Sequence, residues 1–278
     1  MNPTESVPSM ISLTTDFGIE DAYVGSMKGV ILSINPRVGL IDIAHQLPAH
    51  HILRAAFLLR EVCPRFPRGT IHVAVIDPGV GGQRRPALLK IEGRFYVGPD
   101  NGIFGLLLED FALEGAWRLD NREFFLPSVS QTFHGRDIFA PVAAHLAAGI
   151  PPASFGPTLA DPKRQPFPPH HEETTELRGQ VVWVDGFGNC ITNLAGKVIS
   201  RWARGASYVI QAASKRIARI STSYESIPRG EALALFNSMG FLEIACNQAR
   251  ADRTLGLAEG DQVVLEKTRT HDPGEGNP

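Results

Sequence analysis

The chain has 278 residues, of which 43% are hydrophobic and 20% charged, and its formal net charge at pH 7 is -2. This length and this apolar share suffice for two domains with cores of their own, and the balance of charges excludes a broad basic face for nucleic acid or anionic membranes. Apolar stretches such as 55–59 and 232–236 are far shorter than the roughly 18 residues of a membrane span.

The cysteines and the N-terminus bear on the compartment. Cys63, Cys190 and Cys246 are three widely separated residues without a C-x-x-C pair, so we expect neither a disulfide framework nor a zinc site. The first ten residues, MNPTESVPSM, contain no basic start and no apolar segment, so no export signal is expected. These features predict buried, reduced cysteines in a cytoplasmic protein.

Strand-like and helix-like patterns alternate along residues 1–165. Strands are expected over residues 10–14, 38–43, 70–76, 87–91 and 95–97, with 38–43 buried. Helices are expected over 21–33, over 52–62 with its end at Pro64, and over 136–148 in spite of Pro141. The helices are indicated by apolar residues three and four positions apart. The order strand, helix, strand, helix, strand predicts an α/β domain with a mainly parallel sheet.

The pattern changes in the second half of the chain. Residues 160–179 hold four prolines and no periodic apolar face, which is typical of a linker. Short strands are then expected over residues 180–184, 208–212, 216–220, 232–236, 241–245 and 262–266. Their spacing favours a small antiparallel sheet or barrel. We therefore predict an N-terminal α/β catalytic domain over 1–165, a Pro-rich linker over 166–178 and a smaller C-terminal all-β, barrel-like domain over 179–278.

Acidic residues follow the expected parallel strands, at the edge of the sheet where ligands bind. Asp16 follows the first strand, Asp42 and His45 follow the second, and Asp77 follows the third. Two structural interpretations stay open. Asp16 or Asp21 could simply cap the next helix, and Asp42 with His45 could be a hydrogen-bonded pair at a strand end.

Three of the polar groups at this edge suit the activation of water. Asp77 is followed by PGVGG, whose glycines allow a backbone to approach a ligand closely, and then by Arg84. His134, in FHGRD, stands at the start of the last expected helix of this half. A histidine there is more often only a hydrogen-bonding group, but an acid, an arginine and a histidine on separate segments are what a water-activating site needs.

The segment VDGFGN, residues 184–189, interrupts an expected strand. Its structural interpretation is a glycine-bulged hairpin with Phe187 in the core. Its functional interpretation is a platform for a base, in which Phe187 stacks on a purine and the Asn189 amide pairs with the adenine edge. A second turn, 237–240, could close over the same ligand.

Six segments between about residues 10 and 267 carry a resemblance to a known family: LTTDFG-x-x-D, DPGVGG-x-R, YVGPDNG, TFHGRDIFAPVAAHLAAG, VDGFGN-x-ITN and NSMGFLEIA. In their order and joint occurrence the sequence resembles the S-adenosyl-L-methionine (SAM) hydroxide adenosyltransferases, or SAM hydrolases, which are relatives of the fluorinase and chlorinase. The resemblance implies an N-terminal α/β domain, a C-terminal barrel-like β domain, and a homotrimer with sites between subunits.

The resemblance also implies a reaction and its residues. Water or hydroxide attacks the ribose 5′-carbon of SAM in line with the departing sulfur and yields adenosine and L-methionine, with no metal or organic cofactor. The matching catalytic residues are Asp77, Arg84 and His134. The matching substrate-binding residues are Asp16 at the ribose hydroxyls, Phe187 and Asn189 at the adenine, and Asp21, Asp185 and Ser238 around the methionine moiety.

Departures from the halogenating branch define the alternatives. The serine and tyrosine of its halide pocket correspond here to Gly135 and Asp77, and the arginine beside its methionine-binding serine corresponds to Met239, which disfavours halide transfer. Three alternatives remain: a chlorinase-like halogenase, a non-catalytic protein that binds adenosine or SAM, and a metal-dependent hydrolase. The last would use Asp16, Asp42, His45, Asp77 and His134.

Overall fold

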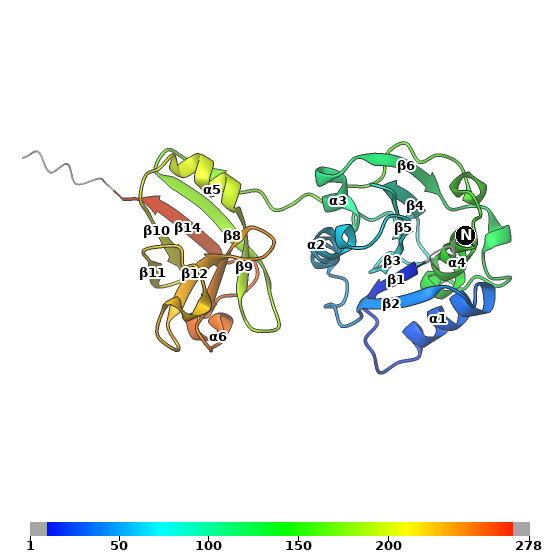
Figure 1. The fold of residues 1–278 in the computed structure, drawn as a ribbon, viewed down its shortest axis with the longest axis horizontal. Helices are drawn as coiled ribbons and strands as arrows, with labels where there is room; N and C mark the ends of the chain where they lie inside the picture. The colour runs from blue at the N-terminus through cyan, green and yellow to red at the C-terminus, as the bar shows by residue number, and fades with distance from the viewer. Residues whose placement is uncertain (1–9, 269–278) are drawn as a thin grey trace, which may run out of the picture. The chain divides into compact units, whose positions relative to one another are not determined.

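The computed structural model describes residues 10–268, so most of the N-terminal segment considered for an export signal lies outside the described residues. The chain divides into two compact units, with the boundary between Pro166 and Phe167 (Figure 1). Within the described range, no helix combines the length and the apolar character that crossing a membrane requires.

The first unit is built on a six-stranded sheet with the order β2-β1-β3-β5-β4-β6. The strands are β1 (Met10–Thr15), β2 (Gly39–Ala44), β3 (Ile71–Val75), β4 (Pro86–Ile91), β5 (Arg94–Pro99) and β6 (Leu113–Arg118). Strands β2, β1, β3 and β5 are parallel to one another, and β4 is antiparallel to both β5 and β6. The prediction of a mainly parallel sheet in an α/β domain is therefore confirmed.

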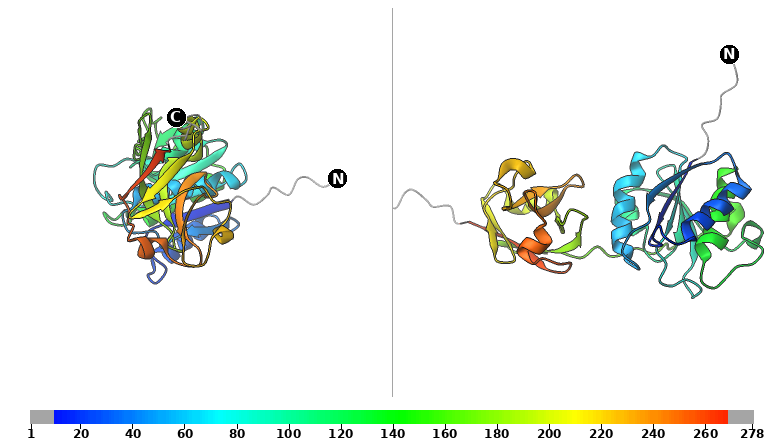
Figure 2. Two further views of the ribbon diagram at one scale, coloured as in Figure 1. Left: turned by 90° about the vertical axis from the view of Figure 1, so that its left-hand side faces the viewer. Right: turned by 90° about the horizontal axis from the view of Figure 1, so that it is seen from below.

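Helices cover both faces of this sheet (Figure 2, right). They are α1 (Tyr23–Ile34), α2 (Ile52–Val62), α3 (Gly105–Asp110) and α4 (Ala140–Ala147), with a 3₁₀ turn at Cys63–Arg65 and a π-helical turn at Gly135–Phe139. One core contains residues of α1 and α4 with Ile11 and Val73, and the other contains residues of α2 and α3 with Ala74. Successive strand residues face opposite sides, which produces the two cores.

Three details differ from the sequence prediction. Strand β2 was expected to be buried, but it is an edge strand without a fully buried residue. Among residues 10–268 it pairs only with β1, and several of its side chains are exposed. Helix α3 and strand β6 were not predicted, because six residues each are too short to show a period and Leu106–Leu108 form a continuous buried run. The helix predicted over 136–148 is present as the π-helical turn Gly135–Phe139 followed directly by α4, with Pro141 near the start of α4.

The second unit is an antiparallel sheet with the order β11-β10-β14-β8-β9-β13-β12, and β7 adds to β8. The strands are β7 (His171–Glu172), β8 (Glu176–Val184), β9 (Cys190–Ala195), β10 (Tyr208–Ala212), β11 (Lys215–Ile217), β12 (Ala232–Phe236), β13 (Phe241–Cys246) and β14 (Gln262–Lys267). A bridge between Ile220 and Ala234 joins the two ends of the order. The sheet is thus a nearly closed barrel, as predicted.

Secondary structure in this unit begins earlier than expected. Strand β7 and the start of β8 lie within 166–178, the range predicted as linker. Pairing of Glu176 with Glu266 on β14 satisfies the backbone there, although the segment has no apolar period. Helices α5 (Gly196–Ala203) and α6 (Ala251–Leu255) were also not predicted. Trp202 of α5 and Ala251 of α6 belong to the core of the barrel.

A fully buried histidine lies in the middle of the first sheet. His72 on β3 is in register with Ser12 on β1 and Tyr96 on β5. Its Nδ1 lies 2.6 Å from Ser12 Oγ, and its ring stacks on Tyr96 with 5.1 Å between centroids. Burial, together with the positive charge of Arg94, lowers the pKa of His72 to about 3. The imidazole is therefore neutral in the folded protein at ordinary pH.

This histidine predicts an acid-sensitive fold. The unfolded chain binds the proton at a pKa of roughly 6.5, so His72 stabilises the fold fully above that pH and progressively less as the pH falls towards 3. The loss is about 1.4 kcal/mol per pH unit below 6.5, or about 2 kcal/mol at pH 5. His72→Gln should remove that part of the loss. Urea unfolding of wild type and of His72→Gln at pH 7 and pH 5 measures the free energy of unfolding. An equal decrease between pH 7 and pH 5 in the two proteins would contradict the prediction.

Candidate active site

The predicted catalytic residues come from segments at one edge of the first sheet. Thr15 and Val75 are register partners at the ends of β1 and β3, so Asp16 and Asp77 leave the sheet side by side. His134 directly precedes the π-helical turn that leads into α4. The parallel order of β1 and β3 therefore places these segments at the carboxyl edge, where open α/β sheets bind ligands.

Asp77, Arg84 and His134 form a connected cluster, as the sequence predicted. Arg84 Nε donates to both carboxylate oxygens of Asp77 at 2.9 Å, and one terminal nitrogen of Arg84 also pairs with Asp77 Oδ2. That terminal nitrogen lies 2.7 Å from His134 Nδ1. The side chains of Arg84 and Asp77 are only 8% and 4% exposed. The guanidinium is thus held between a carboxylate and an imidazole, largely out of water.

This contact decides the protonation state of His134. A guanidinium donates hydrogen bonds and cannot accept one, so Nδ1 must be the acceptor and the single proton of the neutral ring sits on Nε2. Burial lowers the pKa of His134, and the charge of Arg84 lowers it further, against the opposing effects of Asp77, Asp137 and a hydrogen bond to the Ser130 backbone. His134 is therefore neutral at pH 7 and carries its proton on Nε2.

The loop between β3 and β4 is held by hydrogen bonds to residues that follow β5. Asn101 Nδ2 donates to the carbonyl of Ile76 at 2.8 Å, directly before Asp77. Arg85 Nε donates to the buried Asp100 at 2.8 Å. The two adjacent arginines therefore have different roles. Arg84 is part of the cluster with Asp77 and His134, and Arg85 anchors the loop. Asp100 and Asn101 were not among the predicted site residues, although YVGPDNG places them at the end of a strand.

A second support lies around the π-helical turn. Asp137 is completely buried and accepts hydrogen bonds from Ser130 N at 2.9 Å and Ser130 Oγ at 2.7 Å. Gly81 has φ +74°, and a Cβ there would lie 2.2 Å from the carbonyl oxygen of Gln131. Only glycine fits, so the loop carrying Arg84 packs directly on the segment that precedes His134. The acid of FHGRD was the available sequence signal for Asp137.

Aromatic rings form an apolar wall near the cluster. Phe17, Tyr23 and Phe133 contact one another with ring centroids 5.2–5.7 Å apart. A Cβ placed on Gly135, next to His134, would lie 3.2 Å from Met27 Sδ and 3.3 and 3.4 Å from the rings of Phe133 and Phe17. The residue after His134 is therefore packed against this wall, and a larger side chain would have to displace it.

The other acids of this edge have different partners. Asp16 Oδ2 accepts from His50 N at 2.8 Å, and Asp21 is exposed. The N-cap of α1 is Ala22, without a side-chain cap, so neither acid caps that helix and the capping interpretation was wrong. Asp16 instead holds the loop before α2 with one oxygen.

Asp42 and His45 are paired at the end of β2, as their structural interpretation proposed. Asp42 Oδ1 lies 3.0 Å from His45 Nε2, and its other oxygen lies 2.6 Å from Lys28 Nζ. Burial raises the pKa of Asp42, but the hydrogen bonds and charges of His45 and Lys28 outweigh it, and the pKa is lowered. Among residues 10–268, no three His, Cys, Asp or Glu side chains gather so that they could hold a metal ion.

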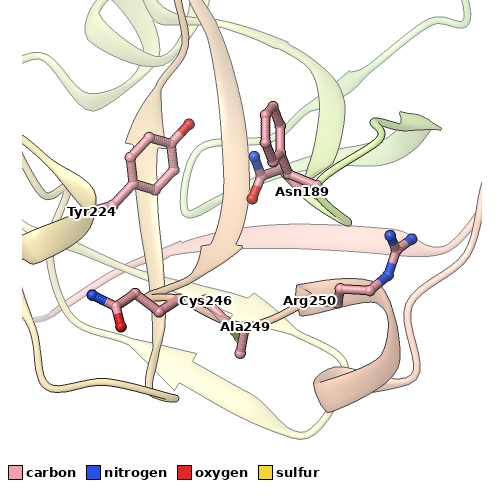
Figure 3. A pocket seen from close by; sticks show the side chains of 7 residues that line it. Asn189, Tyr224, Cys246, Ala249 and Arg250 are labelled. Atoms are coloured by element: carbon pink, nitrogen blue, oxygen red, sulfur yellow. The ribbon is translucent and has the colours of Figure 1, made fainter.

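The second unit contains a pocket of about 480 Å³ (Figure 3). Its lining consists of Phe187, Asn189, Tyr224, Cys246, Gln248, Ala249 and Arg250. Phe187 lies on the turn between β8 and β9 and is 81% exposed, so the interpretation that places it in the core was wrong. A large exposed ring beside a pocket of ligand size suits a stacking surface. Sequence reasoning found Phe187 and Asn189 but missed the residues after β13.

The turn that carries Phe187 and Asn189 is organised by Asp185. Its Oδ1 accepts from Phe187 N and Asn189 N at 2.9 Å, and its Oδ2 accepts from Asn189 Nδ2 at 3.1 Å. Gly188 has φ +86°, and a Cβ there would lie 2.6 Å from Asp252 Oδ1. Asp185 therefore stabilises the turn itself. At position 188 the chain passes so close to α6 that only glycine fits.

Ser238 lies on a different turn. It is exposed between β12 and β13, where Asn237 Oδ1 accepts from Met239 N at 3.0 Å and Phe241 N at 3.1 Å. The structure thus brings Asp77, Arg84 and His134 together in the first unit, and Asp185, Phe187 and Asn189 together in the second.

Comparisons with known proteins agree on one family. Models of the N-terminal and C-terminal domains of SAM hydroxide adenosyltransferases match residues 11–156 and 179–264. The chain is 37% identical to a protein of Thermus thermophilus named (R)-S-adenosyl-L-methionine hydrolase, over 90% of this chain and 97% of that protein. A fluorinase of Nocardia brasiliensis is 25% identical over 96% and 99% of the two chains.

A solved structure shows the same fold. It is described as an uncharacterized conserved protein from Thermotoga maritima, is 33% identical, and superposes with a TM-score of 0.85 over 93% of this chain and all of that chain.

The contact between Arg84 and His134 predicts a titration that can be measured. Because burial and the guanidinium both lower the pKa of His134, its NMR titration should have a midpoint below roughly 6.5, with Nε2 protonated in the neutral form. Arg84→Met removes the positive charge and should raise that midpoint. His145, whose pKa is lowered by burial alone, is the internal control and should not move. An unchanged midpoint for His134, or a proton on Nδ1, would contradict this geometry.

Proposed function

Because the chain belongs to the SAM hydroxide adenosyltransferase family, we propose that it hydrolyses SAM to adenosine and L-methionine. The observation that carries the proposal is the buried cluster of Asp77, Arg84 and His134 at the carboxyl edge of the sheet. The Thermus thermophilus relative, which matches along nearly its whole length, is named for this hydrolysis.

The chemistry of SAM explains why so small a cluster suffices. An oxygen nucleophile forms a bond to the ribose 5′-carbon while the carbon–sulfur bond breaks, and its electron pair stays on sulfur. The positive sulfonium thus leaves as a neutral thioether, so no general acid is needed. Attack by hydroxide gives the 5′-hydroxyl of adenosine directly. The protein has to supply a positioned oxygen in its anionic form.

Arg84 and His134 are suited to hold that oxygen. The guanidinium is buried and fixed by Asp77, so its charge favours hydroxide over water nearby. The neutral His134 offers an N–H at Nε2, which can donate a hydrogen bond to the anion. Nδ1 already accepts from Arg84, so that nitrogen is not a free base. We therefore assign stabilisation of hydroxide to Arg84 and His134, and orientation of Arg84 to Asp77.

The apolar wall assists the same step. When an anion attacks a cation, both charges disappear on the way to the transition state, and water that solvates the separated charges slows the reaction. Phe17 and Phe133, which pack around Gly135 next to His134, offer an apolar surface for this step. Holding the nucleophile and the carbon in line lowers the barrier by several kcal/mol more.

Substrate binding is assigned to both units. Asp16 offers a carboxylate oxygen at the sheet edge for the ribose hydroxyls, and Phe187 and Asn189 form one wall of the pocket for the adenine. Asp21 and Ser238 are exposed, so both carry polar groups available to the methionine moiety. We propose SAM as the small-molecule substrate, with no metal or organic cofactor, since neither bond breaking nor bond formation calls for one.

Halide transfer is the less favoured alternative. The serine of the halide pocket corresponds to Gly135, where a Cβ would press on Met27 and two aromatic rings. The fluorinase is also a more distant relative than the hydrolase, at 25% against 37% identity. A protein that only binds SAM does not need to stabilise hydroxide, so binding alone does not account for the buried Arg84 in contact with the neutral His134.

Two further proposals rest on the family and on composition. A homotrimer with its sites between subunits is supported by the division of the substrate-binding residues between two compact units, and native mass spectrometry measures the subunit number. A cytoplasmic location is supported by three buried, free cysteines, which is typical of a reducing compartment.

The division of roles predicts which kinetic constant each variant changes. Arg84→Ala and His134→Ala should lower kcat for SAM hydrolysis by about 10²- to 10³-fold with little change in KM, because they act on the nucleophile. Asp16→Ala should instead weaken SAM binding by about 10- to 100-fold, because a charged hydrogen-bond acceptor is lost. Adenosine and methionine are quantified by mass spectrometry, with chloride and fluoride present in parallel reactions.

The matched control is Arg118→Ala, which removes an ion-paired but half-exposed arginine and should change neither constant. Equal losses of binding in all three site variants would refute the division of roles. Release of adenine, or consumption of SAM only with halide, would refute the proposed function.

A further inference from the structure

Asp185, the carboxylate that organises the turn between β8 and β9, also contacts a residue that lines the pocket of the second unit. Asn189 is 7% exposed and lines the pocket, and its amide donates a hydrogen bond to Asp185, which is not among the lining residues. We infer that Asp185 is a positioning residue that fixes the orientation of the Asn189 amide and thereby makes the pocket select 6-aminopurines over 6-oxopurines. This inference rests on the proposed function only in placing the adenine of SAM in this pocket.

The orientation of the amide follows from the chemistry of its partner. An asparagine amide has a donor end and an acceptor end of nearly the same shape, and its hydrogen bonds decide which end points where. Asp185 Oδ2 lies 3.1 Å from Asn189 Nδ2, and an ionised carboxylate can only accept. The donor end must therefore face Asp185. If the amide were reversed, two oxygens would face each other at that distance.

The fixed amide presents a defined set of hydrogen-bonding groups to a ligand. One hydrogen of Nδ2 is used by Asp185, so the second hydrogen and the oxygen Oδ1 remain. Figure 3 shows the Asn189 amide directed towards the side of the pocket where Tyr224 lies. An amide with a free oxygen and a free N–H matches adenine, whose 6-amino group donates and whose ring nitrogen accepts. Hypoxanthine has an oxygen at position 6, which would oppose Oδ1.

The turn around Asp185 is built to resist reversal of the amide. The same carboxylate also accepts from the backbone of Phe187 and Asn189 at 2.9 Å, so it cannot move to follow a rotated side chain. The carbonyl of Gly186 accepts from Arg250 at 3.0 Å, and Gly188 is pressed against Arg250 and Asp252. Because the turn is preorganised, the pocket cannot adapt to a 6-oxopurine by turning Asn189 over.

The test is the ratio of the dissociation constants of inosine and adenosine, measured by calorimetry. Wild type should prefer adenosine by about 10- to 100-fold, the discrimination of one bidentate contact. Asp185→Asn keeps the shape and one acceptor oxygen for the two backbone N–H groups, but its nitrogen faces Asn189 Nδ2. The Asn189 amide should then turn over, and the ratio should fall at least tenfold. Asp261→Asn, which changes an exposed acid on a different turn of the same unit, should leave the ratio unchanged.

A second measurement does not depend on the variants. In wild-type protein, one of the two side-chain amide protons of Asn189 should be protected from exchange by its bond to Asp185. Equal, fast exchange of both protons would overturn the inference. So would equal weakening of adenosine and inosine in Asp185→Asn, since that is the effect of a merely structural residue.

The outcomes separate this inference from the proposed function. If wild type hydrolyses SAM and binds adenosine but Asp185→Asn keeps the wild-type ratio, the inference alone fails. If wild type neither binds adenosine nor hydrolyses SAM, the proposed function fails and the inference with it.

Discussion

The buried guanidinium of Arg84 is the constraint on which the first unit depends. A positive charge that is 8% exposed is tolerated only with a partner, and Asp77 provides it through both carboxylate oxygens. The same guanidinium donates to His134 and so sets the tautomer of that ring. One residue thereby fixes the charge, the orientation and the protonation state of the cluster.

The parallel sheet makes this arrangement possible. Adjacent strands β1 and β3 end together, and the loops that follow them meet the π-helical turn before α4. Each loop is fastened by residues outside the cluster: Asn101 holds Ile76, Arg85 holds Asp100, and Asp137 holds Ser130. These contacts preorganise the three side chains, so little reorganisation is left for the chemical step.

The sequence pointed to residues that the fold brings together where residue type and position in the sheet were both informative. Asp77, Arg84 and His134 stand after a strand, in a glycine-rich loop and at a helix start, and the topology brings those positions together. It failed where tertiary contacts decide. The edge position of β2 depends on strand order, and α3 is too short to show a period. The exposure of Phe187 depends on the conformation of the turn between β8 and β9. The bond from Asn189 to Asp185 depends on a turn geometry that glycines permit but do not specify.

The cluster is proposed to deliver an oxygen from water to the ribose 5′-carbon. Hydrolysis of SAM in oxygen-18 water, with mass analysis of both products, shows where that oxygen goes. We expect one labelled oxygen in adenosine, at the 5′-hydroxyl, and none in methionine. Unlabelled adenosine, or label in methionine, would contradict it.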